Sequence, residues 1–307
     1  NLPFNNLFLV ASKKSAGKKI KFRKKEIEIE NLENYDFSKA KITFFAAGSQ
    51  IAKEWVPRAA KKTIVIDNSS YFRMQKDVPL IVPEVNPEAL EKHNNIISNP
   101  NCSTIQMVLP LKSLHDEYKI KRVIVSTYQA VSGAGKASMD ELYDQTTSYL
   151  DGKRIVSKNF TKQIAFNLIP QIDIFDEQGY TKEELKMRNE TKKILDEEID
   201  VSATCVRVPV RTGHSESINI EFHNLFDFEN VLKILKNTPG CRVIDERKDG
   251  GYITPLEAEG SNITYISRIR KDNSNVKAIN LWVVSDNLLK GAALNTVQIA
   301  EWLMKKI

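Results

Sequence analysis

The sequence predicts an α/β protein in which a doubly wound, parallel-sheet domain is joined to a second domain of the α+β class. Apolar runs alternate with helical stretches through the first third of the chain, a pattern that is typical of parallel sheets. Beyond it, β-branched segments lie in longer, more irregular stretches, which favours a mainly antiparallel sheet. The length of 307 residues exceeds what one hydrophobic core usually serves, so two domains are expected.

Each predicted strand is a short apolar run that ends in a polar or glycine-containing turn. In the first part we predict strands at residues 7–10, 42–49 (with the turn), 63–68, 79–83 and 96–98, and helices at 51–62 and 103–114. In the second part we predict strands at 122–128, 205–210, 217–222 and 279–284, and one amphipathic helix over 286–306. Ligands of a doubly wound sheet bind at the carboxyl ends of its strands.

The composition excludes several classes of protein. The net charge is +6, but the lysines are spread along the chain without a nucleic-acid-binding motif, so small anionic substrates are expected rather than RNA or DNA. No run of 18 apolar residues predicts a membrane span. The three cysteines and four histidines are scattered and form no CxxC pair, which predicts neither a metal site nor a disulfide framework. A cytoplasmic protein is the simplest interpretation.

Cys102 is the strongest candidate for a reactive residue. It follows Asn-Pro-Asn and stands where a helix is predicted to begin. The free N–H groups and partial positive charge of a helix start favour the thiolate form of cysteine. Its position alone is equally compatible with a small buried core residue. Cys205 lies in an apolar strand and Cys241 follows Pro-Gly in a turn, so we expect both to be structural.

Five motifs follow one another along the chain. They are residues 100–104 (Pro-Asn-Cys-Ser-Thr), 126–135, 183–186 (Glu-Glu-Leu-Lys), 207–216 (Arg-Val-Pro-Val-Arg-Thr-Gly-His-Ser-Glu) and 285–295. In this order they resemble the nucleophile motif, the second, third and fourth signatures and the C-terminal cofactor segment of bacterial aspartate-semialdehyde dehydrogenases. The resemblance covers essentially the whole chain, and five ordered motifs are far more specific than any one of them.

This resemblance implies a fold, a reaction and a set of site residues. The fold is a dinucleotide-binding domain of residues 1–102 and 285–307, and a catalytic and dimerisation domain of residues 103–284. The reaction is NADPH-dependent reduction of L-aspartyl-4-phosphate to L-aspartate-4-semialdehyde through a cysteine thioester, with release of inorganic phosphate. It serves the biosynthesis of lysine, diaminopimelate, threonine and methionine, and is carried out by a homodimer or homotetramer. The implied residues are Cys102, His214 and Gln129 for catalysis; Arg73, Asn101, Glu183, Lys186 and Arg207 for substrate; and Ser12, Lys14, Ser15, Ser132, Gly133 and Asn287 for NADP.

The implied roles of four residues can be weighed against simpler ones. Histidine suits acid–base work near neutral pH, although for a lone histidine such as His214 a structural hydrogen bond is the more common role. Arg207 would bind the two oxygens of the substrate α-carboxylate through two parallel hydrogen bonds. It lies seven residues before His214 on what reads as one strand, so a shared site would need a bulge. Glu183 and Lys186 are three apart on one helical face, which alone indicates a solvated ion pair.

By the resemblance, Glu183 would instead take the substrate ammonium group, while Lys186 and Arg73 would bind the phosphoryl group. The simpler interpretation of Arg73 is a surface arginine. Gln129 would orient the acyl intermediate through its amide.

The loop after the first strand predicts the choice of cofactor. It contains Ser12, Lys14 and Ser15 and has no carboxylate between residues 7 and 23. A basic loop at this place suits the 2′-phosphate of NADP, whereas an acidic residue would suit NAD. The family commonly has arginine where this chain has Lys14, which keeps the charge but loses the planar fork.

The family's first strand and its glycine-rich pyrophosphate loop are expected to precede residue 7. No GxGxxG pattern occurs before Gly133, so that unit is expected to be missing from the chain. Two alternatives stay open at this point. One is another acyl-phosphate reductase, such as one acting on N-acetylglutamyl phosphate, whose acetylated amine would offer no cation to Glu183. The other is a non-catalytic oligomeric homologue.

Overall fold

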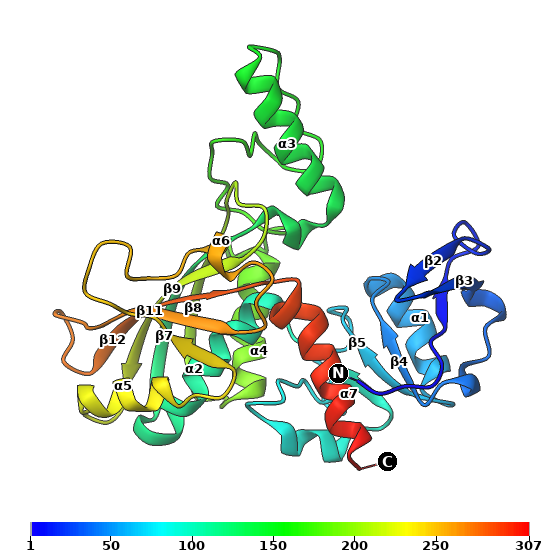
Figure 1. The fold of residues 1–307 in the computed structure, drawn as a ribbon. Coiled ribbons are helices and arrows are strands. Elements are labelled where there is room, and N and C mark those ends of the chain that lie inside the picture. The colour runs from blue at the N-terminus through cyan, green and yellow to red at the C-terminus, as the bar shows by residue number, and fades with distance from the viewer. Residues whose placement is uncertain (1, 307) are drawn as a thin grey trace.

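Twelve strands and seven α-helices make up the part of the chain that the computed structural model describes, residues 2–306 (Figure 1). Residues 1 and 307, the outer limits of the predicted dinucleotide-binding domain, lie outside that range. The strands are β1 (Leu9–Ala11), β2 (Lys19–Phe22), β3 (Lys25–Asn31), β4 (Ile42–Phe45), β5 (Ile64–Asp67), β6 (Ile96–Ser98), β7 (Ile120–Gln129), β8 (Asp200–Arg207), β9 (His214–Phe222), β10 (Cys241–Val243), β11 (Thr264–Lys271) and β12 (Ala278–Ser285). The helices are α1 (Ser49–Ala59), α2 (Cys102–Tyr118), α3 (Lys136–Leu150), α4 (Lys182–Ile194), α5 (Phe228–Lys236), α6 (Pro255–Ala258) and α7 (Leu294–Met304).

Strands β4, β5 and β6 form a parallel sheet with β5 in the middle. Successive residues of a strand point to opposite faces, and both faces of β5 are buried. Val65 packs in a cluster with Ala52 and Val56 of α1, whereas Ile66 packs with Ile299 of α7. The sheet is therefore covered by helices on both faces, which confirms the predicted doubly wound arrangement.

A second small sheet has the order β1-β3-β2, in which β1 and β3 are parallel and β2 and β3 form a hairpin. We did not predict this hairpin, although residues 25–31 alternate between polar and apolar side chains. The predicted strand at residues 7–10 is shifted to β1. The predicted strand at 79–83 is wrong, because only Leu80 makes a bridge, to Ser98. Pro79 and Pro83 lack the N–H groups that a longer ladder would need.

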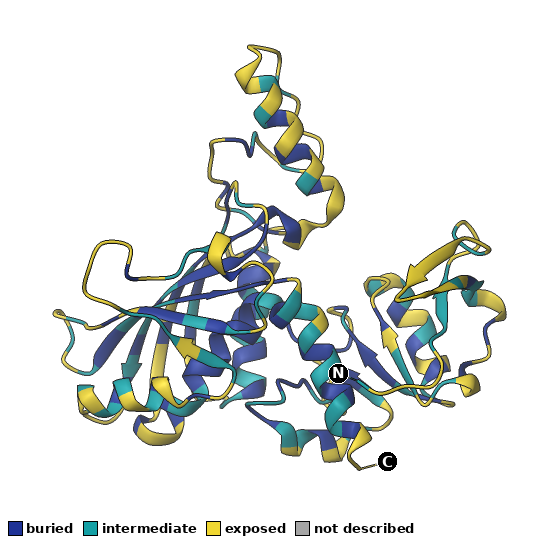
Figure 2. Ribbon diagram, in the orientation of Figure 1, coloured by how far each residue is buried: buried dark blue, intermediate teal, exposed yellow. Residues whose placement is uncertain are grey.

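The larger sheet has six strands in the order β10-β11-β12-β9-β7-β8. Three of its five strand pairs are antiparallel, and the β7·β8 and β10·β11 pairs are parallel. Its apolar face packs against α2 and α5 to form the main core, in which the side chains of β7 and β9 alternate between buried and more exposed positions (Figure 2). Cys205 is fully buried in this core, as expected of a structural cysteine. Cys241 begins β10 rather than standing in a turn.

Helix α3 projects from the rest of the structure as an arm (Figure 1). Its outer surface carries exposed apolar side chains, and Leu150 at its end is 73% exposed. At the other end of the chain, the predicted helix over 286–306 is divided. A π-helical turn, Leu289–Ala293, comes first, and α7 continues from it. Single π-helical turns within helices often occur at functional sites.

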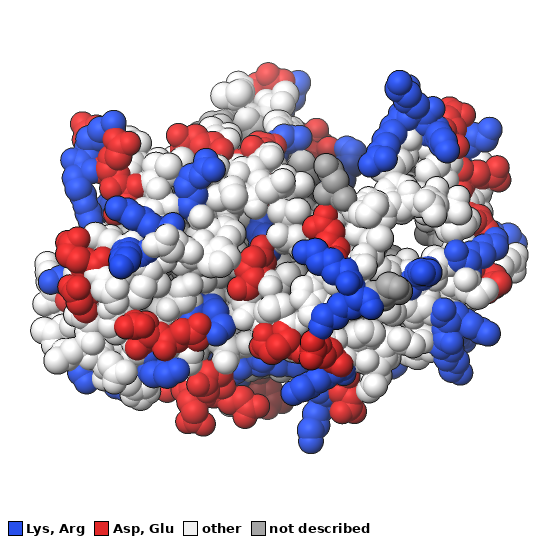
Figure 3. Space-filling view, turned by 60° about the horizontal axis from the view of Figure 1, so that its bottom comes forward, with Lys and Arg blue, Asp and Glu red and all other residues white. Residues whose placement is uncertain are grey.

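Acidic and basic side chains are interspersed on the face of the molecule shown in Figure 3, without a continuous basic stripe. None of the helices within residues 2–306 is long and apolar enough to cross a membrane.

Candidate active site

Cys102 is the first residue of α2. The preceding Asn101 caps the helix, because its side-chain oxygen accepts hydrogen bonds from the N–H groups of Ser103 (3.0 Å) and Thr104 (3.3 Å). Asparagine is among the best residues at this position, which explains why the helix begins where the sequence predicted. Cys102 keeps part of its surface exposed, while its neighbours in the first turn of α2 are buried.

Helix α4 places three charged side chains along one face towards Cys102: Glu183, Lys186 and Glu190. Glu183 Oε1 accepts hydrogen bonds from Asn101 Nδ2 (2.9 Å) and Gln129 Nε2 (3.1 Å), and its Oε2 pairs with Lys186 Nζ at 3.0 Å. Burial raises the pKa of Glu183, but Lys186 and the two amide donors outweigh it and lower the pKa to about 2. The interpretation of Glu183 as a solvated surface residue is therefore wrong, because it is a buried carboxylate.

Three further predicted residues lie at the ends of three adjacent strands of the six-stranded sheet. Gln129 ends β7, Arg207 ends β8 and His214 begins β9. Strand β7 lies between the other two, and Gln129 is paired in register with Arg207. The expectation that Arg207 and His214 share one bulged strand is wrong. They belong to two separate strands that flank β7, so no bulge is needed to bring them together.

His214 is fully buried, and its two ring nitrogens have different surroundings. Nδ1 accepts a hydrogen bond from the Ala130 N–H at 3.1 Å, so the ring proton of the neutral form belongs on Nε2. Nε2 has no hydrogen-bond partner within residues 2–306. Burial and the neighbouring Arg207 lower the pKa of His214 to about 3, so the ring is neutral at physiological pH. The result is a neutral N–H donor that is available to a ligand.

Arg207 and Gln129 differ in how much of their hydrogen-bonding capacity the protein uses. Arg207 is buried, and only its Nη1 has a protein acceptor among the described residues, the Ala130 carbonyl oxygen at 2.7 Å. Both polar atoms of the Gln129 amide have a protein partner, since its Nε2 donates to Glu183 and its Oε1 accepts from the Thr127 hydroxyl at 3.0 Å, and one N–H and one lone pair remain. Arg207 can therefore bind an anion directly, whereas Gln129 is held in one orientation.

The thiol of Cys102 is not activated in the free protein. Burial and the negative charge of Glu183 raise its pKa to about 12, although Arg207, Arg73 and the N–H of Ser103 act in the opposite direction. The helix start does favour the thiolate through the Ser103 N–H, as expected, but this effect is outweighed in the protein without substrate. Desolvation and the nearby carboxylate are stronger here than the partial charge of the helix end.

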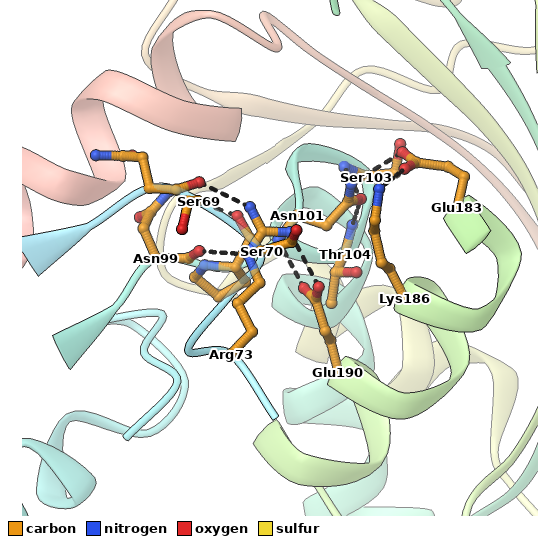
Figure 4. Close-up of polar contacts among 12 residues, drawn as sticks. Ser69, Ser70, Arg73, Asn99, Asn101, Ser103, Thr104, Glu183, Lys186 and Glu190 are labelled. Atoms are coloured by element: carbon orange, nitrogen blue, oxygen red, sulfur yellow. Dashed lines mark hydrogen bonds and ion pairs between the residues drawn. The ribbon is translucent and has the colours of Figure 1, made fainter. Parts of the chain in front are cut away.

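Arg73 is buried rather than at the surface. Its Nε donates to the Asn99 carbonyl oxygen (2.9 Å), its Nη2 donates to the Asn68 carbonyl oxygen (3.0 Å), and its Nη1 pairs with Glu190 (3.0 Å; Figure 4). A guanidinium group has five N–H donors, so two remain for a ligand. Arg73 thus contacts the segment that precedes Cys102, and the phosphate-binding role expected of it stays a prediction.

The predicted cofactor residues form two groups. Ser12, Lys14 and Ser15 belong to the turn after β1, which lies in the N-terminal part of the structure, apart from α2 and α4 (Figure 1). Ser132 and Asn287 contact each other at the catalytic sheet, where Asn287 Oδ1 accepts from the Ser132 hydroxyl (3.1 Å) and from the Gly213 N–H (2.9 Å).

Two glycines approach the catalytic side chains so closely that a side chain would not fit without displacement. A Cβ atom at Gly133 would lie 3.1 Å from Arg207 Nη1 and from His214 Nε2. A Cβ atom at Gly291, in the π-helical turn, would lie 2.9 Å from the Cβ atom of Cys102. Of these residues, Gly133 was predicted from the sequence, whereas Gly291 and the buried Glu190 were not. The helical spacing of Glu190 from Glu183 could have indicated the latter.

Comparisons with known proteins agree with this geometry. Residues 1–93 match the family described as semialdehyde dehydrogenase, NAD binding domain, and residues 111–290 match semialdehyde dehydrogenase, dimerisation domain. The chain is 51% identical over 313 residues to an aspartate-semialdehyde dehydrogenase of Aquifex aeolicus, with 100% of the chain and 92% of the relative covered. It is 50% identical over 308 residues to that of Rickettsia bellii, with 99% and 91% covered.

Two solved structures are similar to this one over nearly its whole length. Aspartate semialdehyde dehydrogenase II of Vibrio cholerae, complexed with ASA, superposes with a TM-score of 0.95 at 47% identity, covering 99% of this chain and 91% of that one. The enzyme of Candida albicans with NADP superposes with a TM-score of 0.77 at 27% identity, covering 98% and 91%. With both domain families matched and about half of the residues identical to curated relatives, the chain belongs to the aspartate-semialdehyde dehydrogenase family.

Proposed function

We propose that the chain catalyses the NADPH-dependent reductive dephosphorylation of L-aspartyl-4-phosphate to L-aspartate-4-semialdehyde through a thioester on Cys102. The observation that carries this proposal is that the charges of Glu183 and Arg207 both act on the Cys102 thiol, while the unpaired Nε2–H of the neutral His214 lies beside Arg207. The names of the relatives support the substrate class. The reaction would serve the biosynthesis of lysine, diaminopimelate, threonine and methionine.

In the first half-reaction the Cys102 sulfur attacks the acyl carbon of the acyl phosphate. The C–O bond to phosphate breaks, a thioester forms, and the thiol proton leaves with inorganic phosphate. Because the pKa of the free thiol is about 12, its proton must be lost as the substrate reacts rather than beforehand. The His214 Nε2–H donates to the acyl oxygen as negative charge develops there, which is the stabilisation that a tetrahedral species needs.

In the second half-reaction NADPH, bound near Ser132, Gly133 and Asn287, would supply the hydride that reduces the thioester. The same His214 N–H would stabilise the negative charge on the acyl oxygen. The Cys102 sulfur would leave as a thiolate and regain its proton from water as the semialdehyde forms. A thioester accepts hydride more readily than a carboxylate does, so the covalent step divides one difficult reduction into two easier reactions.

Charges around Cys102 match the groups of the substrate. Arg207 has donors that no described acceptor uses, so it would bind the α-carboxylate as a fork. Glu183 is an anion in the folded protein and would attract the ammonium group. Lys186, Asn101 and the two remaining donors of Arg73 would bind the phosphoryl group, while Gln129 would hold Glu183 and the acyl group in place.

Residues after β1 fit the 2′-phosphate of NADP. The turn exposes Lys14 and contains no carboxylate. Glu30, on the neighbouring strand, pairs with Lys39 at 3.1 Å and so adds little negative charge there. At the catalytic end, the accepting atom of Asn287 is its Oδ1, so its Nδ2 stays available to donate, next to Ser132 and Gly133.

We assign residues 1–102 and 285–307 to the dinucleotide-binding domain and residues 103–284 to the catalytic and dimerisation domain. The β8 side chains that face away from α4 are more exposed, and all but Val206 are polar, so this face of the sheet is suited to a second copy of the chain. The exposed apolar side chains of α3 provide further contact area. A homodimer or homotetramer in the cytoplasm is consistent with these surfaces and with three free cysteines.

Replacement of Cys102 by serine tests the proposal. Turnover of the semialdehyde with phosphate and NADP should fall by at least roughly a thousandfold while the circular dichroism spectrum stays unchanged. Intact-mass measurement of the wild-type protein with aspartyl phosphate and without NADPH should detect the acyl adduct on Cys102. Cys205→Ser and Cys241→Ser serve as controls and should keep their activity. Substantial turnover by Cys102→Ser would rule out the thioester mechanism.

A further inference from the structure

Glu190 is a buried carboxylate that uses both of its oxygens on the nucleophile loop. Its Oε2 accepts the backbone N–H of Asn101 at 2.6 Å, and its Oε1 pairs with Arg73 at 3.0 Å. Figure 4 shows the Glu190 side chain reaching from α4 to a point between these two partners. Its side chain is 1% exposed and Arg73 is separated from it by 117 positions in the chain, so the contact belongs to the tertiary structure rather than to α4.

Asn101, which precedes the nucleophile, is thereby held from three directions. Its backbone N–H is bound by Glu190, its side-chain Nδ2 by Glu183, and its Oδ1 by the first turn of α2. The two carboxylates come from one face of the same helix. Any shift of Glu190 therefore acts on the backbone next to Cys102.

Arg73 connects the same carboxylate to the second loop of the site. Its remaining contacts are the carbonyl oxygens of Asn68 and Asn99, which belong to the segments after β5 and β6. Lys193, also on α4, donates to the carbonyl oxygens of Arg73, Gln75 and Val78 at 2.7, 2.7 and 2.8 Å. The backbone and the guanidinium group of Arg73 are thus both fixed by α4.

Glu184 provides the contrast. It is also buried on α4, but its oxygens accept the N–H groups of Thr181 and Cys205, so they cap the helix and join it to β8. Neither bond reaches the nucleophile loop. Two buried acidic residues of one helix therefore have different contacts. Glu184 caps α4 and joins it to β8, whereas Glu190 joins α4 to Asn101 and Arg73.

We propose that Glu190 is a positioning residue that couples the phosphate ligand Arg73 to the backbone of the nucleophile through Asn101. The inference rests on the proposed function and deepens it. A phosphate group bound by the free donors of Arg73 would affect the Arg73–Glu190 pair. Through Glu190 it would also affect the Asn101 N–H, which lies next to Cys102. Burial raises the pKa of Glu190, and the charge of Arg73 and the Asn101 N–H oppose that rise, so the three groups depend on one another.

The test uses Glu190→Gln, with Glu184→Gln as the matched control. The amide of glutamine has one acceptor atom, so it can satisfy only one of the two donors that Glu190 accepts. Alkylation of the full-length protein by iodoacetamide is followed on the Cys102 peptide at increasing concentrations of inorganic phosphate. In the wild type we expect phosphate to change the rate. In Glu190→Gln the phosphate concentration for the half-maximal effect should rise by at least about tenfold.

Steady-state oxidation of the semialdehyde gives a second readout. The KM for phosphate should rise in Glu190→Gln by a larger factor than the KM for the semialdehyde, whereas Glu184→Gln should change neither. Equal phosphate constants in Glu190→Gln and the wild type would overturn the proposal, as would equal shifts in the two glutamine variants. If Glu190→Gln does not fold, Glu190→Asp decides in its place. It keeps the charge but is one methylene too short to reach both partners, and an unchanged phosphate constant there would equally overturn the proposal.

Failure of the proposed function is distinguishable from failure of this inference. A wild-type protein without dehydrogenase activity would contradict the function, yet its alkylation would still report whether phosphate acts on Cys102 through Glu190.

Discussion

Gly291 contacts Cys102 so closely that a Cβ atom at position 291 would lie 2.9 Å from the Cβ atom of Cys102. Nothing about the backbone of Gly291 requires glycine, because its φ angle is outside the left-handed region. Glycine is required at position 291 only because Cys102 leaves no room for a side chain. Lys290, in the same π-helical turn, holds the turn in place. Its buried Nζ donates to Glu84 (2.7 Å), Asn295 (3.0 Å) and Gln298 (2.7 Å).

Gly291→Ala should therefore displace Cys102 and lower kcat. A misplacement of about 1 Å at a catalytic group can cost roughly a hundredfold in rate. We expect a loss of about that size, with a smaller change in the KM for the semialdehyde, measured by steady-state kinetics. Ala293→Ser, an exposed change in the same turn, is the control and should be neutral. A Gly291→Ala variant with wild-type kcat would mean that the turn moves away from Cys102 without consequence.

Local sequence patterns predicted part of the candidate site, and the family resemblance supplied most of its other residues. Asn101 is a strong N-cap residue, so the start of α2 at Cys102 could be read directly. Helical spacing placed Glu183 and Lys186 on one face. Contacts between distant segments could not be read in this way. The Arg73–Glu190 pair and the approach of Gly291 to Cys102 depend on how sheet, helix and C-terminal turn pack together.

The energetics of Cys102 were also beyond local reasoning. A helix start by itself favours the thiolate, but the sequence does not show how deeply the thiol is buried or that Glu183 lies beside it. The same limit applies to Glu183, which a pattern of spacing alone presents as a surface ion pair.

Arg207→Lys should raise the KM for the semialdehyde strongly. In the wild type one nitrogen of Arg207 holds the Ala130 carbonyl oxygen at 2.7 Å, which leaves the others for the substrate carboxylate. A lysine has a single charged nitrogen and cannot serve both partners in the same geometry. We expect an increase of at least about tenfold, since losing a charge-assisted bond costs roughly 1.5–3 kcal/mol. Arg211→Lys, at an exposed ion pair with Glu259, is the control. An unchanged KM in Arg207→Lys would remove Arg207 from the carboxylate site.

Lys14→Ala should reduce the preference for NADP over NAD. Lys14 is exposed in the turn after β1, where no carboxylate opposes a phosphate group. With two or three charge-assisted contacts of about 1 kcal/mol each, the wild type should prefer NADP by roughly tens- to hundreds-fold in kcat/KM. The measurement is kcat/KM for both cofactors in each variant, with Lys24→Ala in the β2–β3 turn as control. A wild type that uses both cofactors equally would refute the assignment of this loop. A preserved NADP preference in Lys14→Ala would instead mean that another residue binds the phosphate.

Glu216→Gln should change how stability depends on pH. Glu216 is fully buried on β9, and neither of its oxygens has a hydrogen-bond partner within the described range. Burial raises the pKa of its carboxyl well above 4.5, and a weak interaction with Gln106 opposes this only in part. The folded protein therefore keeps a proton that the unfolded chain loses above pH 4.5. Stability must then fall as pH rises from that value towards the folded pKa, by up to about 1.4 kcal/mol per pH unit from this group.

Glutamine cannot ionise, so the variant lacks this loss of stability. The melting temperature of Glu216→Gln minus that of the wild type should increase as pH rises above 5 towards the folded pKa of Glu216, measured by calorimetry at matched ionic strength. Glu221→Gln is the control on the same strand. Its carboxyl pairs with Lys121 at 2.9 Å, and that contact lowers its pKa, so its titration is complete below this range and its difference from the wild type should stay constant. If the difference for Glu216→Gln is constant or shrinks as pH rises, Glu216 is ionised in the folded protein. Its carboxylate must then accept a hydrogen bond from a donor that lies between α2 and β9.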